Sequence, residues 1–128
     1  MKECRILIVD SDRRFREDLV SALIREGYYV TACKCLTEAL KCIVEVSWHC
    51  IILDVILPEM KGYEAASIIK NIDPNITIIM TTEINSKELE AKVREQKIYY
   101  YFIKSFNKEE IMLAINCLFP SGSRCLSL

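Results

Sequence analysis

Continuous apolar runs, without the polar alternation of a half-exposed strand, constrain the fold of this chain most. Residues 6–9 (Ile-Leu-Ile-Val) and 50–53 (Cys-Ile-Ile-Leu) are the clearest of them. Strands of this kind are covered on both faces, which is typical of a parallel sheet with helices on either side. Further candidate strands span residues 28–32, 76–81 and 99–103.

Segments with apolar residues at helical spacing separate these five candidate strands. The expected helices begin near Ser11, Thr37, Gly62, Ser86 and Asn107, with Ser11, Thr37 and Ser86 as N-caps and Gly27 as a stop signal. The segment 86–97 has a narrow apolar face, so we expect it to be the least firmly packed helix. This alternation predicts a flavodoxin-like α/β fold, a doubly wound five-stranded parallel sheet of order 2-1-3-4-5 with five helices.

Composition restricts the class of protein. The 128 residues suit one domain, 52% are hydrophobic, and the net charge of −1 gives no reason to expect nucleic acid or a membrane as a partner. No apolar run approaches the roughly 20 residues of a membrane span, and no signal-peptide core is present, so we expect a cytoplasmic protein. The seven cysteines lack metal-binding spacing and are interpreted as mostly buried apolar side chains, with Cys125 exposed.

Acidic residues follow two of the predicted central strands. In the predicted strand order, Asp10, Asp12 and Asp54 would meet where the carboxyl ends of these strands adjoin. Converging carboxylates repel one another and favour a hard cation such as Mg²⁺, which phosphoryl transfer also requires. Lys104 and Thr82, also at strand ends, could contact a phosphoryl group. Taken singly, each residue has a plainer explanation as a helix cap or a solvated charge.

Together these residues give the chain a specific resemblance to a known family. The matching residues are Ile-Leu-Ile-Val-Asp10 with Asp12, Asp54-x-x-Leu57-Pro58-x-Met60-x-Gly62, and Thr82, Tyr101 and Lys104 followed by Phe106. The chain resembles the response-regulator receiver domain of two-component phosphorelay signalling, from about Cys4 to Phe119. The resemblance implies a receiver domain over residues 1–119 and a short tail over 120–128. Because only residues 120–128 follow the last expected helix, we expect a stand-alone protein without an output domain, similar to the chemotaxis regulators.

The resemblance also implies roles for single residues. Asp54 would be the phosphoacceptor, phosphorylated by a sensor histidine kinase or a histidine phosphotransfer protein. Mg²⁺ would be held by Asp10, Asp54 and the backbone carbonyl of Ile56, with Ser11 or Asp12 as a further candidate ligand. Thr82, Tyr101 and Lys104 would contact the phosphoryl group or switch with it, and no residue would be catalytic, so we expect no enzyme. A downstream protein target would bind the surface of residues 86–119, and a homodimer through this surface is an open alternative.

Four positions depart from the usual pattern of the family. Ser11 replaces the second of two adjacent acids, which predicts weak Mg²⁺ binding, and Glu83 stands where a small residue is usual. Ser105 follows Lys104 where the family usually has a proline, commonly after a cis bond, and a cis bond before a non-proline residue costs about 2.5–4 kcal/mol. Either the loop holds the bond cis against this cost, or the bond is trans and Lys104 shifts. Thr81 adjoins Thr82, so the switch assignment stays open between the two, with spacing in favour of Thr82.

These departures leave two alternative functions open. The first is a degenerate receiver that acts as a phosphorylation-independent protein-interaction module. The second, more remote one is a haloacid dehalogenase-like phosphatase with Asp10 as nucleophile. It is disfavoured because Arg14 stands where Thr or Val is usual and the chain has no room for a cap. Within the receiver interpretation, Ile56 and Ile84 flank the expected site, and we predict that they slow hydrolysis of the aspartyl phosphate.

Overall fold

The computed structural model describes residues 4–84, 86–104 and 108–120. Its five strands are all parallel: β1 (Arg5–Val9), β2 (Tyr29–Cys33), β3 (Cys50–Asp54), β4 (Thr77–Thr82) and β5 (Tyr100–Ile103). Their order in the sheet is β2-β1-β3-β4-β5, as predicted. Several strands lie slightly nearer the carboxyl end than the apolar runs indicate, and β3 therefore includes Asp54.

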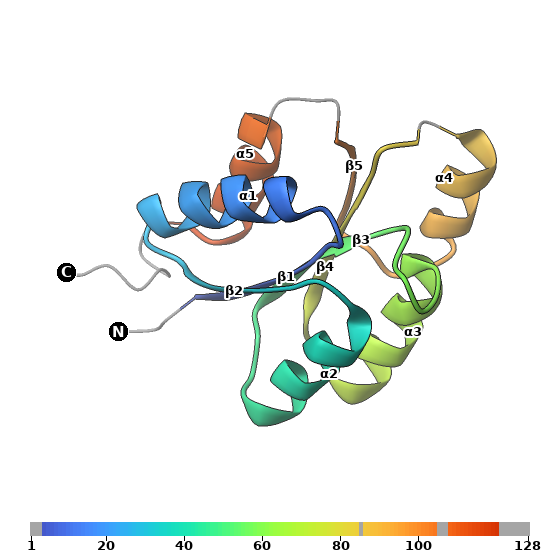
Figure 1. The fold of residues 1–128 in the computed structure, drawn as a ribbon, viewed down its shortest axis with the longest axis horizontal. Coiled ribbons are helices and arrows are strands. Elements are labelled where there is room, and N and C mark those ends of the chain that lie inside the picture. Colours follow the sequence, from blue (N-terminus) through green and yellow to red (C-terminus); the bar gives the residue numbers. More distant parts are fainter. Residues whose placement is uncertain (1–3, 85, 105–107, 121–128) are drawn as a thin grey trace.

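Five helices cover the two faces of the sheet. They are α1 (Arg13–Arg25), α2 (Leu36–Glu45), α3 (Gly62–Ile72), α4 (Lys87–Arg94) and α5 (Lys108–Leu118). Helices α1 and α5 lie on one face, and α2 and α3 lie on the other (Figure 1). Alternate residues of β1 enter two separate cores: Ile6 and Ile8 pack toward α1 and α5, and Leu7 and Val9 pack toward α2 and α3. This double coverage explains the uninterrupted apolar runs.

The predicted helix caps are partly confirmed. Ser86 caps α4 by accepting a hydrogen bond from the Leu89 amide at 3.3 Å. Gly27, just after α1, has a φ of 93°, as a helix stop requires. The cap of α1, however, is Asp12 rather than Ser11, because the Asp12 carboxylate accepts from the Phe15 amide at 3.2 Å. The predicted helix start at Asn107 lies outside the described residues.

The start of α2 contradicts the predicted Thr37 cap. Cys35 occupies the N-cap position and makes no side-chain cap bond. The carboxylate of Glu59, from the loop between β3 and α3, accepts from the Leu36 and Thr37 amides and from the Thr37 hydroxyl at 3.0–3.1 Å. These hydrogen bonds hold the pKa of Glu59 down at about 2, chiefly through the Thr37 amide. The loop that follows Asp54 is thereby tied to α2.

Gly62, at the first position of α3, packs directly against the end of β3. A Cβ atom built on it would overlap the backbone oxygen of Asp54 and lie 2.7 Å from the Met80 methyl group. The Gly62 amide also donates to the Val55 carbonyl at 2.5 Å. Only glycine fits this close approach of two backbones, so Gly62 fixes the position of Asp54 relative to α3.

The cysteines follow the predicted burial only in part. Cys4, Cys33 and Cys50 are buried, and Cys35 and Cys42 are half-buried. Cys117 is exposed, which contradicts the expectation, because it lies on the outer side of α5, away from Ala114 and Ile115. Cys125 lies outside the described residues.

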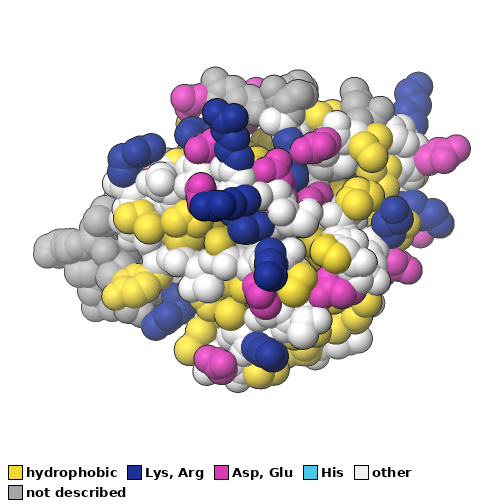
Figure 2. Space-filling model, in the orientation of Figure 1, with side chains coloured by type: hydrophobic (Ala, Val, Ile, Leu, Met, Phe, Trp, Pro, Cys, Tyr) yellow, Lys and Arg dark blue, Asp and Glu magenta, His cyan; other side chains and the backbone are white. Residues whose placement is uncertain are grey.

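The surface carries no large patch of one charge in the view of Figure 2. Lysine and arginine side chains alternate with aspartate and glutamate over this face, as the net charge of −1 suggests (Figure 2). Among the described residues, no helix is long and apolar enough to cross a membrane.

Candidate functional site

The predicted acidic residues and Lys104 meet at the carboxyl ends of β1, β3 and β5. The ammonium of Lys104 lies 2.8 Å from Asp10 Oδ2, 3.0 Å from Asp10 Oδ1 and 3.2 Å from Asp54 Oδ2. All three side chains are buried, with exposed fractions of 7% for Lys104, 1% for Asp10 and 9% for Asp54. Two carboxylates therefore share one ammonium group away from bulk water.

Backbone and side-chain donors fix both acids. Asp10 Oδ1 accepts from the Asp12 amide at 2.9 Å, and the Asp10 carbonyl accepts from the Arg16 guanidinium at 2.7 Å. Asp54 Oδ1 accepts from the Ile56 amide at 3.2 Å. The ring of Phe15, 4.7 Å from Lys104 Nζ, covers the ammonium. The contact between Phe15 and Lys104 is invisible in the sequence, where Phe15 shows only the helical spacing of a core residue.

The electrostatics of this cluster favour an additional positive charge. Burial, and then the charge of Asp10, raise the pKa of Asp54 to about 6, against the opposing effect of Lys104. Burial alone would lower the pKa of Lys104, but its hydrogen bond to Asp10 and the charges of both acids raise it. Asp54 is thus mostly ionised at neutral pH, and one ammonium faces two carboxylates.

The donor atoms fit a hard cation with few protein ligands. Asp10 Oδ2 is buried and receives no hydrogen bond from any described residue, since Lys104 Nζ is close to it but poorly aligned. Asp12 has one oxygen engaged in capping α1, which leaves it less available. No group of three or more His, Cys, Asp or Glu residues is arranged around a metal position within the described ranges. Two carboxylates with a carbonyl and water suit Mg²⁺ better than a metal that needs a full protein cage.

The two candidate switch threonines end β4 on opposite faces of the sheet. Thr82 lies on the same face as Met80 and its neighbour Tyr101, toward α2, α3 and α4, and its hydroxyl accepts from the Ile84 amide at 3.1 Å. Thr81 is the register neighbour of Asp54 on the other face. Among the described residues, neither the Thr81 hydroxyl nor the Tyr101 hydroxyl finds a hydrogen-bond partner. Thr81 is therefore favoured as the switch residue by its position beside Asp54, and Thr82 is favoured by its position on the same face as Tyr101.

A cavity of about 240 Å³ opens from Asp54 to the surface. Its other lining residues are Ser11, Asp12, Ile56, Glu83, Ile84 and Lys104. Ile56 is 38% exposed and Ile84 is 51% exposed, so both flank the entrance as predicted. Glu83 places a carboxylate at the same entrance. Ser105 and Phe106 lie outside the described residues, so the choice between a cis and a trans bond before Ser105 stays open.

The accessible acid of the cluster is Asp54 rather than Asp10. Asp10 is absent from the lining of the cavity, and its carboxylate is occupied by Lys104 and the Asp12 amide. This burial argues against the phosphatase alternative, in which Asp10 would attack a substrate.

Comparison with known proteins agrees with this geometry. The family model described as response regulator receiver domain matches residues 6–116. The transcriptional regulatory protein SrrA of Staphylococcus aureus is 31% identical over 113 residues, covering 88% of this chain and 46% of that protein. The chain thus spans about half the length of this relative.

Two solved receiver structures share the fold at comparable identity. The response regulator TrrA of Thermotoga maritima, in complex with Mg²⁺ and BeF, is 30% identical with a TM-score of 0.78, over 92% of this chain and 99% of that one. The beryllofluoride-activated NtrC4 receiver domain dimer is 31% identical with a TM-score of 0.84, over 90% and 95% of the two chains. The chain therefore belongs to the response-regulator receiver domain family of two-component systems.

Proposed function

We propose that this chain is a phosphorelay receiver that accepts a phosphoryl group on Asp54 from a histidine kinase or histidine phosphotransfer protein. The observation that carries the proposal is the shared ammonium: Lys104 bridges Asp10 and Asp54, and only Asp54 opens to the cavity. A phosphoryl group in this cavity would contact Lys104 on one side and the residues at the entrance, Ile56 and Ile84, on the other. The proposal concerns this domain alone, and the expected absence of an output domain stays a prediction.

The chemistry asks little of the protein beyond position and charge. An oxygen of the ionised Asp54 carboxylate attacks the phosphorus of a phosphohistidine, the phosphorus–nitrogen bond breaks, and the histidine nitrogen keeps the electron pair and takes up a proton. The product is an aspartyl phosphate. Lys104 balances the added charge, and the Ile56 amide holds the other carboxylate oxygen in place.

We expect Asp10, Asp54 and the Ile56 carbonyl to hold Mg²⁺, with Ser11 or Asp12 contributing through water. The ion would neutralise charge on the transferred phosphoryl oxygens. Affinity should be weak, because Ser11 supplies no charge and Asp12 is engaged at the start of α1. A titration that gave a submicromolar dissociation constant for Mg²⁺ would contradict this arrangement.

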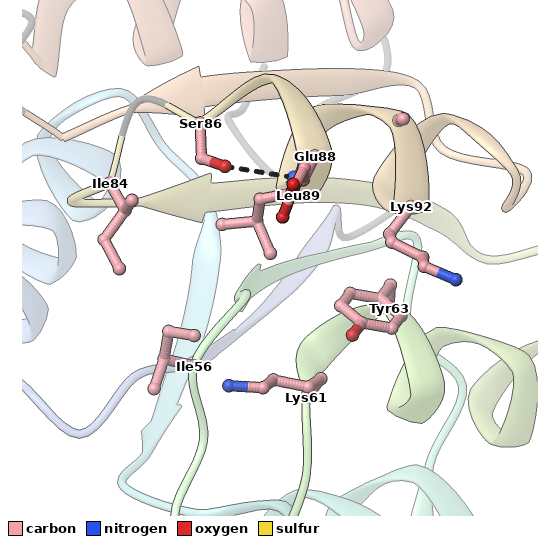
Figure 3. Close-up of a pocket in the computed structure, with 9 residues that line it drawn as sticks. Ile56, Lys61, Tyr63, Ile84, Ser86, Glu88, Leu89 and Lys92 are labelled. Carbon is pink, nitrogen blue, oxygen red and sulfur yellow. Dashed lines mark hydrogen bonds between the residues drawn. The ribbon is translucent and has the colours of Figure 1, made fainter.

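Phosphorylation would act on partner proteins by changing the position of α4. This helix buries only Val93, and Leu89 adds a partly buried contact. A groove of about 550 Å³ runs beneath its first turn, with Leu89 and Ile84 on one side and Ile56, Lys61 and Tyr63 across from them (Figure 3). Thr82 leads directly into this segment, so movement of its hydroxyl toward new phosphoryl oxygens would displace the thinly packed helix.

A downstream protein would bind the surface of residues 86–119, to which α4, β5 and α5 belong. Tyr99 and Tyr100 are 48% and 45% exposed on this side. Their rings pack edge to face, with the ring centroids 4.8 Å apart. Exposed aromatic side chains next to a movable helix suit a protein interface. A homodimer is the alternative occupant, since the similar NtrC4 receiver domain was solved as a dimer.

One observation favours a phosphorylation-independent interaction module as the second candidate. Glu83 lines the entrance of the Asp54 cavity and would repel an incoming phosphodonor. In that case the Lys104 bridge would be a permanent structural ion pair, and the fold would act as a binding surface alone.

A small-molecule phosphodonor separates the two candidates. The full chain is incubated with acetyl phosphate or phosphoramidate and Mg²⁺, and its intact mass is recorded. We expect a gain of one phosphoryl group in wild type and in Asp18→Asn, an exposed change outside the site, and none in Asp54→Asn. Absence of the gain in wild type, with the fold confirmed by circular dichroism, would favour the interaction module. If Glu83 is the obstacle, Glu83→Ala should then restore the gain.

A further inference from the structure

Two cysteines from different elements lie in contact on the α2 side of the sheet. Cys33 is the last residue of β2, and Cys42 lies in the second turn of α2. Their sulfur atoms are 3.8 Å apart. The structure describes both as free thiols, and a disulfide would require their sulfur atoms to approach to about 2.05 Å.

We propose that Cys33 and Cys42 form a reversible redox pair that closes to a disulfide when a hydroperoxide is present. The Cys42 sulfur attacks the peroxide, the oxygen–oxygen bond breaks, and Cys42 becomes a sulfenic acid with release of one water or alcohol molecule. The Cys33 sulfur then attacks the Cys42 sulfur and displaces the hydroxyl group, which leaves as water with the Cys33 proton. Two electrons pass from the two thiols to the peroxide, and a dithiol restores the starting state.

Contact and exposure together set this pair apart from the other described cysteines. Cys35 is also half-buried, but the sulfur that lies against Cys33 is that of Cys42. Cys42 is half-buried and can meet a small oxidant, while Cys33 is 3% exposed and serves as the resolving thiol behind it. Cys4 and Cys50 are both 1% exposed or less, so an oxidant cannot reach either of them first. Cys117 is exposed, but it lies on α5, across the sheet from α2.

The pair is joined to the acidic site through backbone hydrogen bonds. The Cys33 carbonyl accepts from the Asp10 amide at 3.0 Å, and Cys33 pairs with Val9 in the sheet. The other end of the junction, the start of α2, is held by Glu59 from the loop after Asp54. A disulfide would therefore tie β2, whose last residue bonds to Asp10, to α2, whose start bonds to Glu59 in the loop after Asp54.

Peptide mapping tests the pair directly, whatever the outcome for phosphorylation. The full reduced chain is treated with dilute hydrogen peroxide, its remaining thiols are alkylated, and it is digested with trypsin and chymotrypsin. Cleavage after Lys34, Lys41 and Trp48 puts Cys33, Cys35, Cys42 and Cys50 on different peptides. We expect a cross-link between the peptides that end at Lys34 and Trp48, removed by dithiothreitol, and a melting temperature above that of the reduced protein.

Matched variants decide the assignment. Cys42→Ser and Cys42→Ala should both lose the cross-link, leave Cys33 free for alkylation and abolish the oxidative rise in melting temperature, whereas Cys117→Ser should keep all three responses. The proposal is overturned if Cys33 and Cys42 remain free while Cys117 oxidises. It is equally overturned if Cys42 proceeds to a sulfinic acid, or if Cys33 is linked to Cys35 instead.

Discussion

The acidic site and helix α4 adjoin each other but are held in place very differently. At the site, Asp10 and Asp54 are 1% and 6% exposed as whole residues, their oxygens bond to the Asp12 and Ile56 amides, and Lys104 bridges them. Helix α4 buries one side chain, Val93, and lies over a groove of about 550 Å³. Its only ion pair within the helix, Glu90 to Arg94 at 2.7 Å, is at the surface and adds little.

This difference indicates how a receiver can transmit a signal. Phosphoryl transfer needs the acids and the hydrogen-bond donors around them to be held in place before the reaction. A donor that is out of position stabilises the transition state less. The responding element needs the opposite property, a small free-energy difference between two positions. The chain meets both needs with adjacent segments, since Thr82 ends a strand that is buried at every residue but the first, and Ile84, two residues later, is 51% exposed.

A side chain added at Gly62 should lower the stability of the protein most, because Gly62 packs against the end of β3. In Gly62→Ala the new methyl group would overlap the Asp54 carbonyl, so we expect the free energy of unfolding to fall by about 2–3 kcal/mol. Chemical denaturation measures this loss. Ser67→Ala, an exposed change in the same helix, is the control and should stay within about 0.5 kcal/mol of wild type. Equal stability of both variants would show that Asp54 and α3 are not packed this closely.

Neutralising Asp54 should stabilise the site at neutral pH. Folding raises the pKa of Asp54 from 3.8 to about 6, so the folded protein disfavours the charged carboxylate. The resulting cost is absent below pH 3.8, grows as pH rises through this window and is complete above about 6. Asp54→Asn should therefore raise the free energy of unfolding by about 1–3 kcal/mol at pH 7 in EDTA, and by much less near pH 4. A stabilisation that does not change with pH would contradict this electrostatic account.

The hydrogen bonds between Glu59, in the loop after Asp54, and the start of α2 should contribute less to the free energy of unfolding. Glu59→Gln keeps the size of the side chain but removes the charge at the start of α2, and we expect a loss of about 0.5–1 kcal/mol. Folding lowers the pKa of Glu59 from 4.5 to about 2, so this contribution is complete above pH 4.5 and disappears as pH falls toward 2. Urea unfolding at pH 7 and pH 3 measures both values. The control is Glu45→Gln, because Glu45 is exposed to solvent. Glu64→Gln is unsuitable as a control, because the Glu64 carboxylate accepts a hydrogen bond from the Lys61 amide.

Opening the entrance of the cavity should change a rate rather than the stability. If Ile56 and Ile84 hinder the attacking water, Ile84→Ala should shorten the lifetime of the aspartyl phosphate several-fold with little effect on unfolding. The decay is followed by intact mass after removal of the phosphodonor. A wild-type half-life of seconds, or an unchanged lifetime in Ile84→Ala, would reject this role for the two isoleucines.

The sequence predicted the strand order and placed Asp10, Asp54 and Lys104 together, because uninterrupted apolar runs and strand-end charges are local signals. It misjudged features that depend on competition or distance. Ser11 and Asp12 both offer an oxygen to the first turn of α1, and only the backbone path decides that Asp12 caps it. The Glu59 bond to α2 joins residues more than 20 positions apart and leaves no local pattern.

The cysteines show the same limit. Cys33 and Cys42 each read as a small core residue, and their contact follows from the packing of α2 on β2, which spacing does not reveal. Cys117 has apolar neighbours in sequence but lies on the outward side of α5, so its exposure depends on which helix face meets the sheet. Side-chain type alone therefore predicts burial less well than position on the helix.

Hydrogen exchange with and without phosphorylation tests the central claim, that a fixed acidic site acts on a loosely held α4. Backbone amide exchange is measured by mass spectrometry in buffer that contains Mg²⁺, before and after treatment with a phosphodonor, with Asp54→Asn treated in parallel. We predict faster exchange in α4 than in α3 at the start, and a change on phosphorylation confined mainly to residues 86–103. No change in Asp54→Asn is expected. Phosphorylated wild type with unchanged exchange in α4, or with an equal change in α3, would contradict the account.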